Sequence, residues 1–181
     1  GYLYYVENGE LKSLPQKESR GYIKYSIIKD KLYLTQPKGV LIYDLKSLKP
    51  IYFYPIIDIN IRSTYSVGSK FYFIGDYIYE IDYPKKLKKY ELSDDFKKTL
   101  EVPIVQVIKD ELFIVSKYSN YYYILKNNQL NKKKFSSSFD FIQNIAYIDN
   151  SPWLCTPNGI IKYENNKTNT YFSDYNISYI F

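Results

Sequence analysis

The sequence predicts an all-β protein built from repeated four-stranded antiparallel units. The first observation is compositional: 45% of the 181 residues are hydrophobic, with 24 Tyr and 10 Phe. Aromatic and β-branched side chains suit the pleated surface of a sheet better than a helix. The second observation is a repeat of about forty residues. The third is the lack of an apolar pattern with helical period, apart from one turn expected at 94–100.

The repeat appears as similar residues at a constant spacing. Three pairs stand 120 positions apart, which is three times forty: Tyr33 and Trp153, Gly39 and Gly159, and Tyr43 and Tyr163. Two further copies lie between the members of these pairs, at 70–82 and 111–125, and half a copy opens the chain at 3–11. The copies have apolar strands joined by short polar turns, many of them containing Gly, which is typical of antiparallel hairpins.

Each complete unit contains four short strands, as in the segments 61–67, 70–74, 77–82 and 87–92. The second strand of a unit is almost entirely apolar, so we expect it to be buried on both faces. The fourth strand is rich in lysine, as at 85–90 and 131–135. Lysine on an outer strand opposes edge-to-edge pairing between sheets.

Four-stranded antiparallel units at this period are typical of the blades of a β-propeller. The sequence therefore predicts a single β-propeller domain over residues 1–181, with about five blade-like units, or a fragment of a larger propeller. The expected boundaries are a partial blade at 1–20, blades at about 21–55, 56–100, 101–137 and 138–175, and a strand of the next blade at 176–181.

The composition excludes several kinds of chemistry. The chain has no His, which is the commonest general base near neutral pH and the commonest neutral metal ligand. A single Cys allows neither an internal disulfide nor a multi-cysteine zinc site. We therefore expect no catalytic residues, no metal and no cofactor. No apolar stretch is long enough for a transmembrane helix, so we expect no direct membrane insertion by this segment.

Charge gives little support for nucleic-acid binding. The net charge is +6 and the pI is about 9.0. The lysines fall on the outer strands of separate blades, which indicates a solvated rim rather than a groove that follows phosphates. The acidic residues Asp44, Asp82 and Glu164 end the third strands of different blades, so we expect them to cap turns rather than to form a catalytic pair.

Two conspicuous side chains have structural explanations. Trp153 could stack on a sugar, but it occupies the inter-blade core position that Tyr33, Tyr72 and Phe113 occupy in the other units. Cys155 could be a nucleophile, but no His is present to activate it. We therefore expect both residues to belong to the core.

If a ligand binds, the loops at one face of the ring are the expected place, because a rigid scaffold holds its recognition residues on loops. The links from second to third strands supply the candidate ligand-binding residues, which are Lys38, Asp76, Tyr118, Asn120 and Asn158. Tyr118 lies in the longest of these links and is the best candidate for stacking on a sugar or a partner.

The segment 141–164 resembles the two-component regulator propeller repeat. It has an apolar strand, an Asp-Asn turn, the strand Trp153-Leu154-Cys155-Thr156, an Asn-Gly turn, and a strand ending Tyr163-Glu164. Pro152 stands where the family usually has Leu, and Cys155 where it has Gly. The segment 27–44 shows a fair match.

This resemblance implies an extracytoplasmic sensor module of a bacterial hybrid two-component protein that responds to an oligosaccharide or another small ligand. It further implies a periplasmic location, a parent protein anchored in the inner membrane, and contacts with other propeller or sensor domains of the same polypeptide or within a homodimer. The alternatives are a propeller scaffold for protein–protein contact without a small ligand and, third, a glycan lyase or hydrolase. An enzyme of the last kind needs two carboxylates within about 5–10 Å of each other.

Overall fold

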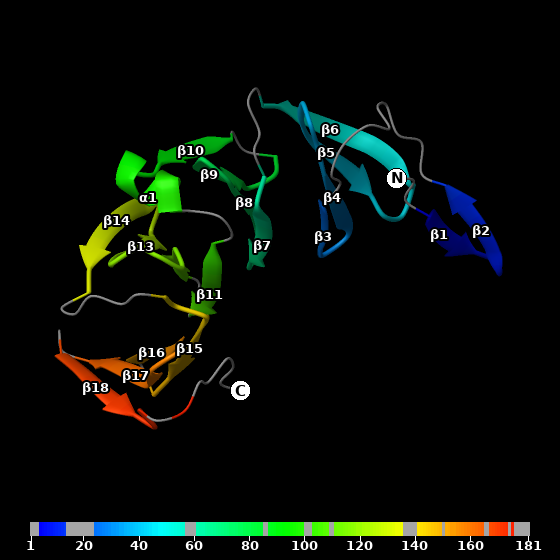
Figure 1. The fold of residues 1–181 in the computed structure, drawn as a ribbon. Helices are drawn as coiled ribbons and strands as arrows, with labels where there is room; N and C mark the ends of the chain where they lie inside the picture. Colours follow the sequence, from blue (N-terminus) through cyan, green and yellow to red (C-terminus); the bar gives the residue numbers. More distant parts are fainter. Residues whose placement is uncertain are drawn as a thin grey trace. The chain divides into compact units, whose positions relative to one another are not determined.

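The computed structural model describes residues 4–13, 24–56, 61–84, 87–99, 103–108, 111–135, 141–149, 151–164, 167–173 and 175. The chain forms two compact units, residues 1–89 and residues 90–181. Almost every element is a strand (Figure 1). The strand expected at 176–181 lies outside the described residues.

The first unit contains a hairpin and two sheets in which strands adjacent in sequence pair side by side. The hairpin consists of β1 (Tyr4–Glu7) and β2 (Glu10–Ser13). The first sheet consists of β3 (Lys24–Ile28), β4 (Lys31–Gln36), β5 (Gly39–Asp44) and β6 (Lys49–Pro55). The second consists of β7 (Ser63–Val67), β8 (Lys70–Ile74), β9 (Tyr77–Ile81) and β10 (Lys88–Glu91), the last of which crosses the boundary between the units.

The second unit contains one short helix and two sheets of the same kind. The helix α1 (Asp94–Thr99) is the single turn expected from the sequence. The first sheet consists of β11 (Ile104–Ile108), β12 (Glu111–Val115), β13 (Tyr121–Lys126) and β14 (Gln129–Lys134). The second consists of β15 (Asn144–Ile148), β16 (Ser151–Thr156), β17 (Gly159–Glu164) and β18 (Lys167–Tyr171).

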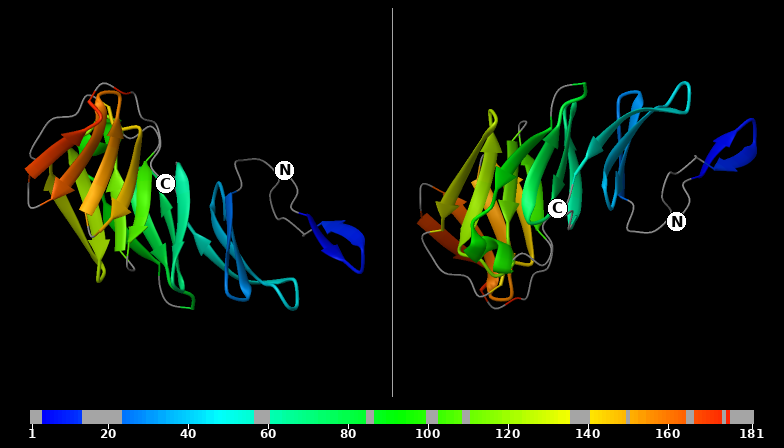
Figure 2. Two further views of the ribbon diagram at one scale, coloured as in Figure 1. Left: turned by 90° about the horizontal axis from the view of Figure 1, so that it is seen from below. Right: turned by 90° about the horizontal axis from the view of Figure 1, so that it is seen from above.

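Within each unit the two four-stranded sheets pack face to face around aromatic side chains. The first strands of consecutive sheets are neighbours: β3 lies beside β7, and β11 lies beside β15. In the first unit the rings of Tyr33 and Phe71, which come from the two sheets, have centroids 5.1 Å apart. In the second unit Figure 2 shows the two sheets as stacked layers, and Leu154 and Tyr163 of one sheet share a cluster with Phe113 and Tyr122 of the other.

Burial confirms the predicted role of the second strand in three of the four sheets. Strands β4, β8 and β12 are buried at every position after the first. Tyr33, Tyr72 and Phe113 are 5% exposed or less. Their equivalent Trp153 is only half-buried, although we expected it in the core, and its ring lies 5.4 Å from that of Tyr171. Cys155 is buried as expected, and burial raises the pKa of its thiol.

The fourth strands differ in their protection against edge pairing. Strands β10 and β14 carry the expected exposed lysines. Strand β6 instead exposes the large side chains of Ile51, Tyr52 and Phe53. Pro50 and Pro55, which cannot donate a backbone hydrogen bond, limit the length of edge that another strand could pair with.

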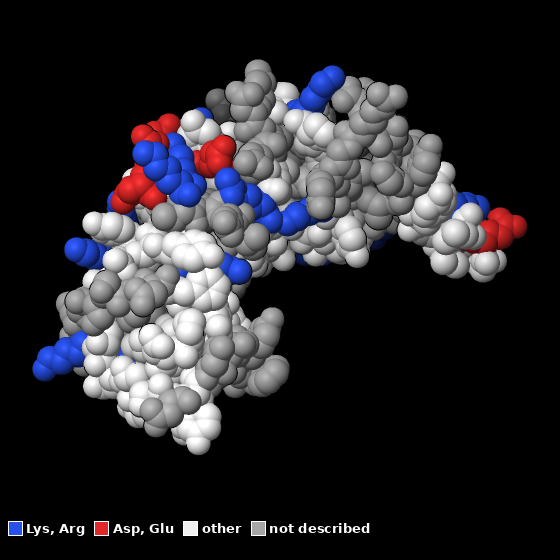
Figure 3. All heavy atoms as spheres, viewed as in Figure 1, with Lys and Arg blue, Asp and Glu red and all other residues white. Residues whose placement is uncertain are grey.

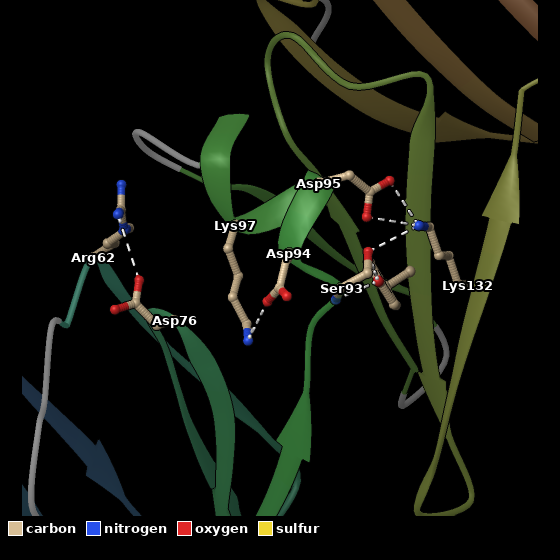
Figure 4. A network of polar contacts seen from close by, with 8 residues as sticks. Arg62, Asp76, Ser93, Asp94, Asp95, Lys97 and Lys132 are labelled. Carbon is tan, nitrogen blue, oxygen red and sulfur yellow. Dashed lines mark hydrogen bonds and ion pairs between the residues drawn. The ribbon is translucent and has the colours of Figure 1, made fainter.

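The helix α1 is tied to the first sheet of its unit by polar contacts. Charged atoms of both signs gather around it (Figure 3). The ammonium of Lys132, on β14, donates to both carboxylate oxygens of Asp95, at 3.0 and 2.8 Å, and to the hydroxyl of Ser93, at 2.8 Å (Figure 4). The hydroxyl of Tyr123 also donates to Ser93 Oγ, at 2.7 Å, and its ring packs edge-on against Phe96. The hydrogen bond from Lys132 is the main reason why the pKa of Asp95 falls to about 2.

Two glycines occupy turns that no other residue can fill without movement. Gly39 and Gly159 begin equivalent third strands and have φ of +152° and +111°. A Cβ at Gly39 would lie 2.1 Å from the carbonyl oxygen of Tyr54, and one at Gly159 would lie 2.6 Å from the carbonyl oxygen of Phe172.

We predict that Gly39→Ala and Gly159→Ala each lower the free energy of unfolding by about 3 kcal/mol or more, because backbone must move as well as adopt an unfavourable φ. Gly68→Ala is the matched control, since Gly68 has φ of +57° but no atom within 4 Å of the added Cβ. It should cost about 1 kcal/mol, from the left-handed backbone alone. Urea unfolding measures all three, and equal losses would contradict the steric explanation.

We also predict a pH dependence from Asp95. Its folded-state pKa lies below the ordinary value of 3.8, so the ionised carboxylate stabilises the folded protein above about pH 4. That stabilisation is lost as the pH falls through about 2. Because the pair is largely exposed, Asp95→Asn should cost less than about 1 kcal/mol at neutral pH and nothing at pH 2 or below. Lys132→Gln should give a similar loss at neutral pH in urea unfolding, and a loss that does not change with pH would sink the assignment.

Candidate functional site

A pocket of about 440 Å³ lies between the two sheets of the second unit. It opens at the end of the sheets where β11 meets β12 and β15 meets β16, because residues at the ends of these strands line it. The lining residues are Ile108, Glu111, Phe113, Tyr122, Ile124, Lys133, Tyr147, Asp149, Ser151, Pro152, Tyr163 and Glu164. Both sheets therefore contribute, and the pocket belongs wholly to one compact unit.

The floor of the pocket is aromatic and tightly packed. The rings of Phe113 and Tyr122 stack with centroids 4.7 Å apart and an interplanar angle of 23°. Tyr163, from the opposite sheet, meets Tyr122 edge-on at 6.2 Å. Burial above all, and then the neighbouring Tyr163, raise the pKa of Tyr122, whose phenol is hydrogen-bonded to that of Tyr163. Tyr147 is only half-buried and offers the most accessible ring.

The rim of the pocket is polar. Glu111 pairs with Lys126, with 2.5 Å between Oε1 and Nζ. Glu164 pairs with Lys162 at 3.0 Å and accepts a hydrogen bond from the hydroxyl of Ser151 at 3.3 Å. The hydrogen bond from Lys162 lowers the pKa of Glu164. Both glutamates are therefore held in place by lysines as hydrogen-bond acceptors at the rim of the pocket.

The repeat explains why there is space at this junction. Pro152 follows the spacing of Trp153, so its equivalents in the other units are Leu32, Phe71 and Leu112. Those three residues are buried, at 5%, 0% and 1% exposure, and fill their positions. Pro152 is smaller and only half-buried. A smaller side chain at a packing position leaves volume that the surrounding sheets do not fill.

Of the five loop residues predicted to bind a ligand, Tyr118, Asn120 and Asn158 lie at the opposite end of the strands of the second unit from this pocket. Lys38 and Asp76 belong to the first unit, and Tyr118, Asn120 and Asn158 belong to the second. Lys38 and Asn158 are exposed, and Asp76 pairs with Arg62 at 3.6 Å (Figure 4). Each of them lies in the link between a second and a third strand, whereas the pocket is lined from the other ends of β12 and β16.

Tyr118 contributes to a loop contact in the second unit. Its ring is 49% exposed and lies 5.2 Å from that of Phe141. The amide of Ile142 donates to the carbonyl of Lys117 at 2.8 Å, and the amide of Phe135 donates to the carbonyl of Asn120 at 2.9 Å. The loop is thus fixed by its backbone and presents Tyr118 as a flat exposed ring.

Among the acidic ends of the third strands, Asp44 caps the turn that follows it, as expected. Asp44 accepts hydrogen bonds from the amide and hydroxyl of Ser47, at 2.8 and 2.9 Å. Asp82 accepts one from Ser69 at 3.3 Å. Glu164 is different, because it lines the pocket together with Glu111 and Asp149. Sequence reasoning missed this grouping, since Glu111 and Asp149 lie in a different set of turns.

The pocket suits recognition of a polar ligand with apolar faces. Its rings can contact the faces of a ligand, while its carboxylates and hydroxyls accept and donate hydrogen bonds. Among the residues that the structure describes, no three His, Cys, Asp or Glu side chains are grouped so as to hold a metal ion. Within the same residues, no helix has the length and apolar character needed to cross a membrane.

Comparison with solved structures shows a propeller-like fold. Over 91% of this chain and 60% of the other, it matches a catalytically inactive virginiamycin B lyase from Staphylococcus aureus, in complex with quinupristin, at 14% identity and a TM-score of 0.59. In that lyase a histidine is replaced by alanine. A quinonprotein alcohol dehydrogenase-like protein from Bacteroides thetaiotaomicron matches over 95% of this chain and 51% of the other, at 16% identity and a TM-score of 0.52.

An extracellular domain assigned to a hybrid two-component system of Bacteroides thetaiotaomicron also matches, at 12% identity and a TM-score of 0.48, over 92% of this chain and 27% of that one. The chain spans 54% to 60% of the length of the S. aureus lyases that it matches. No protein-family model and no curated protein matches the sequence. The all-β blade architecture expected from the sequence is confirmed, and these similarities show the fold alone.

We predict that the buried and the half-buried tyrosines of the pocket respond differently to truncation. Tyr163→Ala should lower the free energy of unfolding by about 3 kcal/mol or more, because it removes a buried ring that packs on Tyr122 and Phe135. Tyr147→Ala should cost about 1 kcal/mol or less, because its ring is half-buried. Urea unfolding compares the two, and similar losses would mean that Tyr147 is a packing residue rather than an accessible wall.

Proposed function

We propose that this chain is the ligand-recognition module of an extracytoplasmic sensor of the bacterial hybrid two-component type, and that its ligand is an oligosaccharide. The observation that supports this most directly is the pocket between β11–β14 and β15–β18. It combines aromatic walls with rim acceptors that are already oriented. The resemblance of segment 141–164 to the two-component regulator propeller repeat supports the sensor assignment, a periplasmic location and a parent protein anchored in the inner membrane.

A sugar ring matches the pocket in both of its chemical characters. Its faces present C–H groups that pack on an aromatic ring, and its edges present hydroxyls. Tyr147 and Pro152, both half-buried, offer apolar surface. Glu111 and Glu164 can accept hydrogen bonds from hydroxyl groups, and their ion pairs with lysines hold them in place. Ion pairing with a lysine also offsets most of the desolvation cost of covering each carboxylate with a bound ligand.

Recognition without catalysis agrees with the residues available. The lyase with a similar fold is described as inactive when one of its histidines is replaced by alanine. These 181 residues contain no His. A glycoside hydrolase would need a carboxyl group with a raised pKa to protonate the leaving oxygen. Lys162 shifts Glu164 in the opposite direction, toward a lower pKa.

The alternative function is a scaffold for protein–protein contact. One feature favours it: β6 exposes three consecutive large apolar residues, Ile51, Tyr52 and Phe53, where the other outer strands are mostly polar. Such a patch is typical of a surface that another protein covers. This alternative requires no ligand in the pocket.

Binding of a panel of neutral oligosaccharides tests the proposal. Isothermal titration calorimetry measures the affinity of each oligosaccharide. Pro152→Leu introduces the residue found in two of the three other units and should fill the pocket, abolishing binding while the fold is kept. Tyr147→Ala should weaken binding by about tenfold or more, which corresponds to about 1.4 kcal/mol.

Tyr118→Ala is the matched control, because it removes an exposed tyrosine at the opposite end of the same sheets. It should leave the affinity unchanged. If Tyr118→Ala abolishes binding and Pro152→Leu does not, the ligand occupies the loops instead of the pocket. If no oligosaccharide binds the unmodified chain, recognition of a glycan by this segment is wrong. Turnover of a bound glycan would refute the non-catalytic assignment.

A further inference from the structure

We propose that β1 is an acceptor edge for a β-hairpin of a partner polypeptide, which adds to β1 as the first and second strands of its sheet. The proposal goes beyond ligand recognition and does not depend on it. Four features of the first unit support it: the place of the β1–β2 hairpin in the repeat, the exposure of its apolar side chains, the direction of its backbone groups, and the apolar side chains that β3 exposes.

The hairpin β1–β2 is a two-stranded sheet that corresponds to the last two strands of a four-stranded one (Figure 1). In its turn, φ is positive at both central residues, +52° at Asn8 and +79° at Gly9. The turn between β13 and β14, a third and a fourth strand, has the same form, with +48° at Asn127 and +62° at Asn128. The turn between β3 and β4, a first and a second strand, has positive φ at Lys29 alone.

The hairpin exposes apolar side chains where the four-stranded sheets bury them. Val6 and Leu11 lie opposite each other in the register, and each is 68% exposed. The equivalents of Val6 in the third strands of the four sheets are at most 7% exposed, and they are Tyr43, Ile81, Leu125 and Tyr163. In each of those sheets a second strand lies beside the third. An isolated two-stranded hairpin is at best marginally stable in water, so a strand added to β1 would stabilise it.

The backbone of β1 directs hydrogen-bonding groups away from β2. Glu7 and Glu10 pair across the two-residue turn, and Val6 pairs with Leu11. Pairs that exchange hydrogen bonds alternate with pairs that do not, and the pair that closes a two-residue turn is of the first kind. The N–H and C=O of Val6 therefore point away from β2. Among the described strands, β2 is the only one that pairs with β1, and such an edge can accept a further strand.

The repeat defines the chemistry of the incoming strand. In the sheet β3–β6, Leu32 of the second strand lies opposite Tyr43 of the third. Val6 holds the position of Tyr43, so the same register places an apolar side chain of the partner opposite Val6. Apolar cross-strand pairs of this kind are a main source of stability in a sheet. The second strand of the partner hairpin is therefore apolar, as β4 is.

Charge specifies the first residue of that strand. Lys31 begins β4 and lies opposite Asp44 at the end of β5. In the sheet β11–β14 the same two positions hold Glu111 and Lys126, which form an ion pair at 2.5 Å. Opposite charges that face each other across two strands stabilise the pair. Glu7 holds the position of Asp44 in the repeat, so a lysine at the start of the incoming strand complements it.

The first strand of the partner hairpin has its own place on the sheet β3–β6. First strands of consecutive sheets are neighbours in both units, because β3 lies beside β7 and β11 lies beside β15. On β3, Ile28 packs in the cluster shared with the next sheet, so Tyr25 and Ile27 lie on the other face. These two side chains are 60% and 57% exposed. A first strand that continues the repeat lies beside β3 and covers them, which is why a hairpin fits better than a single strand.

A synthetic hairpin copied from this chain tests the proposal. The peptide of residues 24–36 contains a first and a second strand, and its second strand begins with Lys31 and Leu32. The peptide is labelled with a fluorophore and the full chain is titrated into it. We expect the fluorescence anisotropy to rise to saturation at micromolar concentrations of the chain, because the peptide adds to β1.

A methylated peptide separates strand addition from simple apolar adhesion. Gln36 and Gly39 close the two-residue turn between β4 and β5, so Leu34 and Leu32 belong to pairs that exchange hydrogen bonds with the third strand. N-methylation at Leu32 and Leu34 removes these donors and spares the bonds between β3 and β4. The methylated peptide should bind at least about tenfold more weakly.

Val6→Lys should weaken binding of the unmodified peptide by at least about tenfold, because it places a charge opposite an apolar side chain of the incoming strand. Leu11→Lys is the matched control. Leu11 is equally exposed and lies on the same face, but it belongs to β2, and other fourth strands carry lysine. It should keep the affinity within about twofold. Both variants should fold, since both side chains are exposed.

Three outcomes would overturn the proposal. The first is no binding of the unmodified peptide. The second is equal binding of the methylated peptide or unchanged affinity in Val6→Lys, which would place the peptide elsewhere, for example on the exposed side chains of β6. The third is a dimer of the chain alone in sedimentation velocity that Val6→Lys dissociates, because a second copy would then occupy the edge.

Discussion

The structure depends on aromatic packing between the faces of consecutive sheets. Every four-stranded sheet has a second strand that is apolar on both sides, so it is stable only when a neighbouring sheet covers it. Tyr33 meets Phe71 in this way in the first unit, and Phe113 shares a cluster with Tyr163 in the second. Apolar burial at about 25 cal/mol per Å² is the main favourable term in such a junction. Trp153 illustrates the same requirement for a covering sheet, because it is half-buried whereas its equivalents in the other three sheets are buried.

The pocket arises from one departure from this packing rule. Leu32, Phe71 and Leu112 fill three equivalent positions, and the smaller Pro152 occupies the fourth. A loss of packing at one junction destabilises a protein unless something else fills the space. The neighbouring polar groups make that space suitable for a ligand rather than for another side chain. Under the proposed function, recognition and stability compete at Pro152, because the residue usual in the repeat would close the site.

Charge plays two roles in a fold that is otherwise built from apolar contacts. Lysines on β10 and β14 keep the outer edges solvated, and Lys132 fastens the helix through Asp95. At the pocket the charges are paired, because Lys126 binds Glu111 and Lys162 binds Glu164. Charged groups therefore solvate the edges of the sheets and hold the acceptors of the pocket in place.

The sequence by itself determined the strand order, the four-stranded units, the helical turn and the burial of the second strands, because these follow from local alternation and a constant spacing. It also determined that Cys155 is buried. It did not locate the pocket: reasoning from loops favoured Tyr118 and its neighbours, whereas the cavity lies at the other ends of the strands. Only the tertiary structure brought Glu111, Asp149 and Glu164 together, because they come from turns and strand ends of two sheets. The sequence nevertheless contained one signal of the pocket, which is Pro152 in place of a larger residue. The structural consequence of that smaller residue depends on what faces it across the junction.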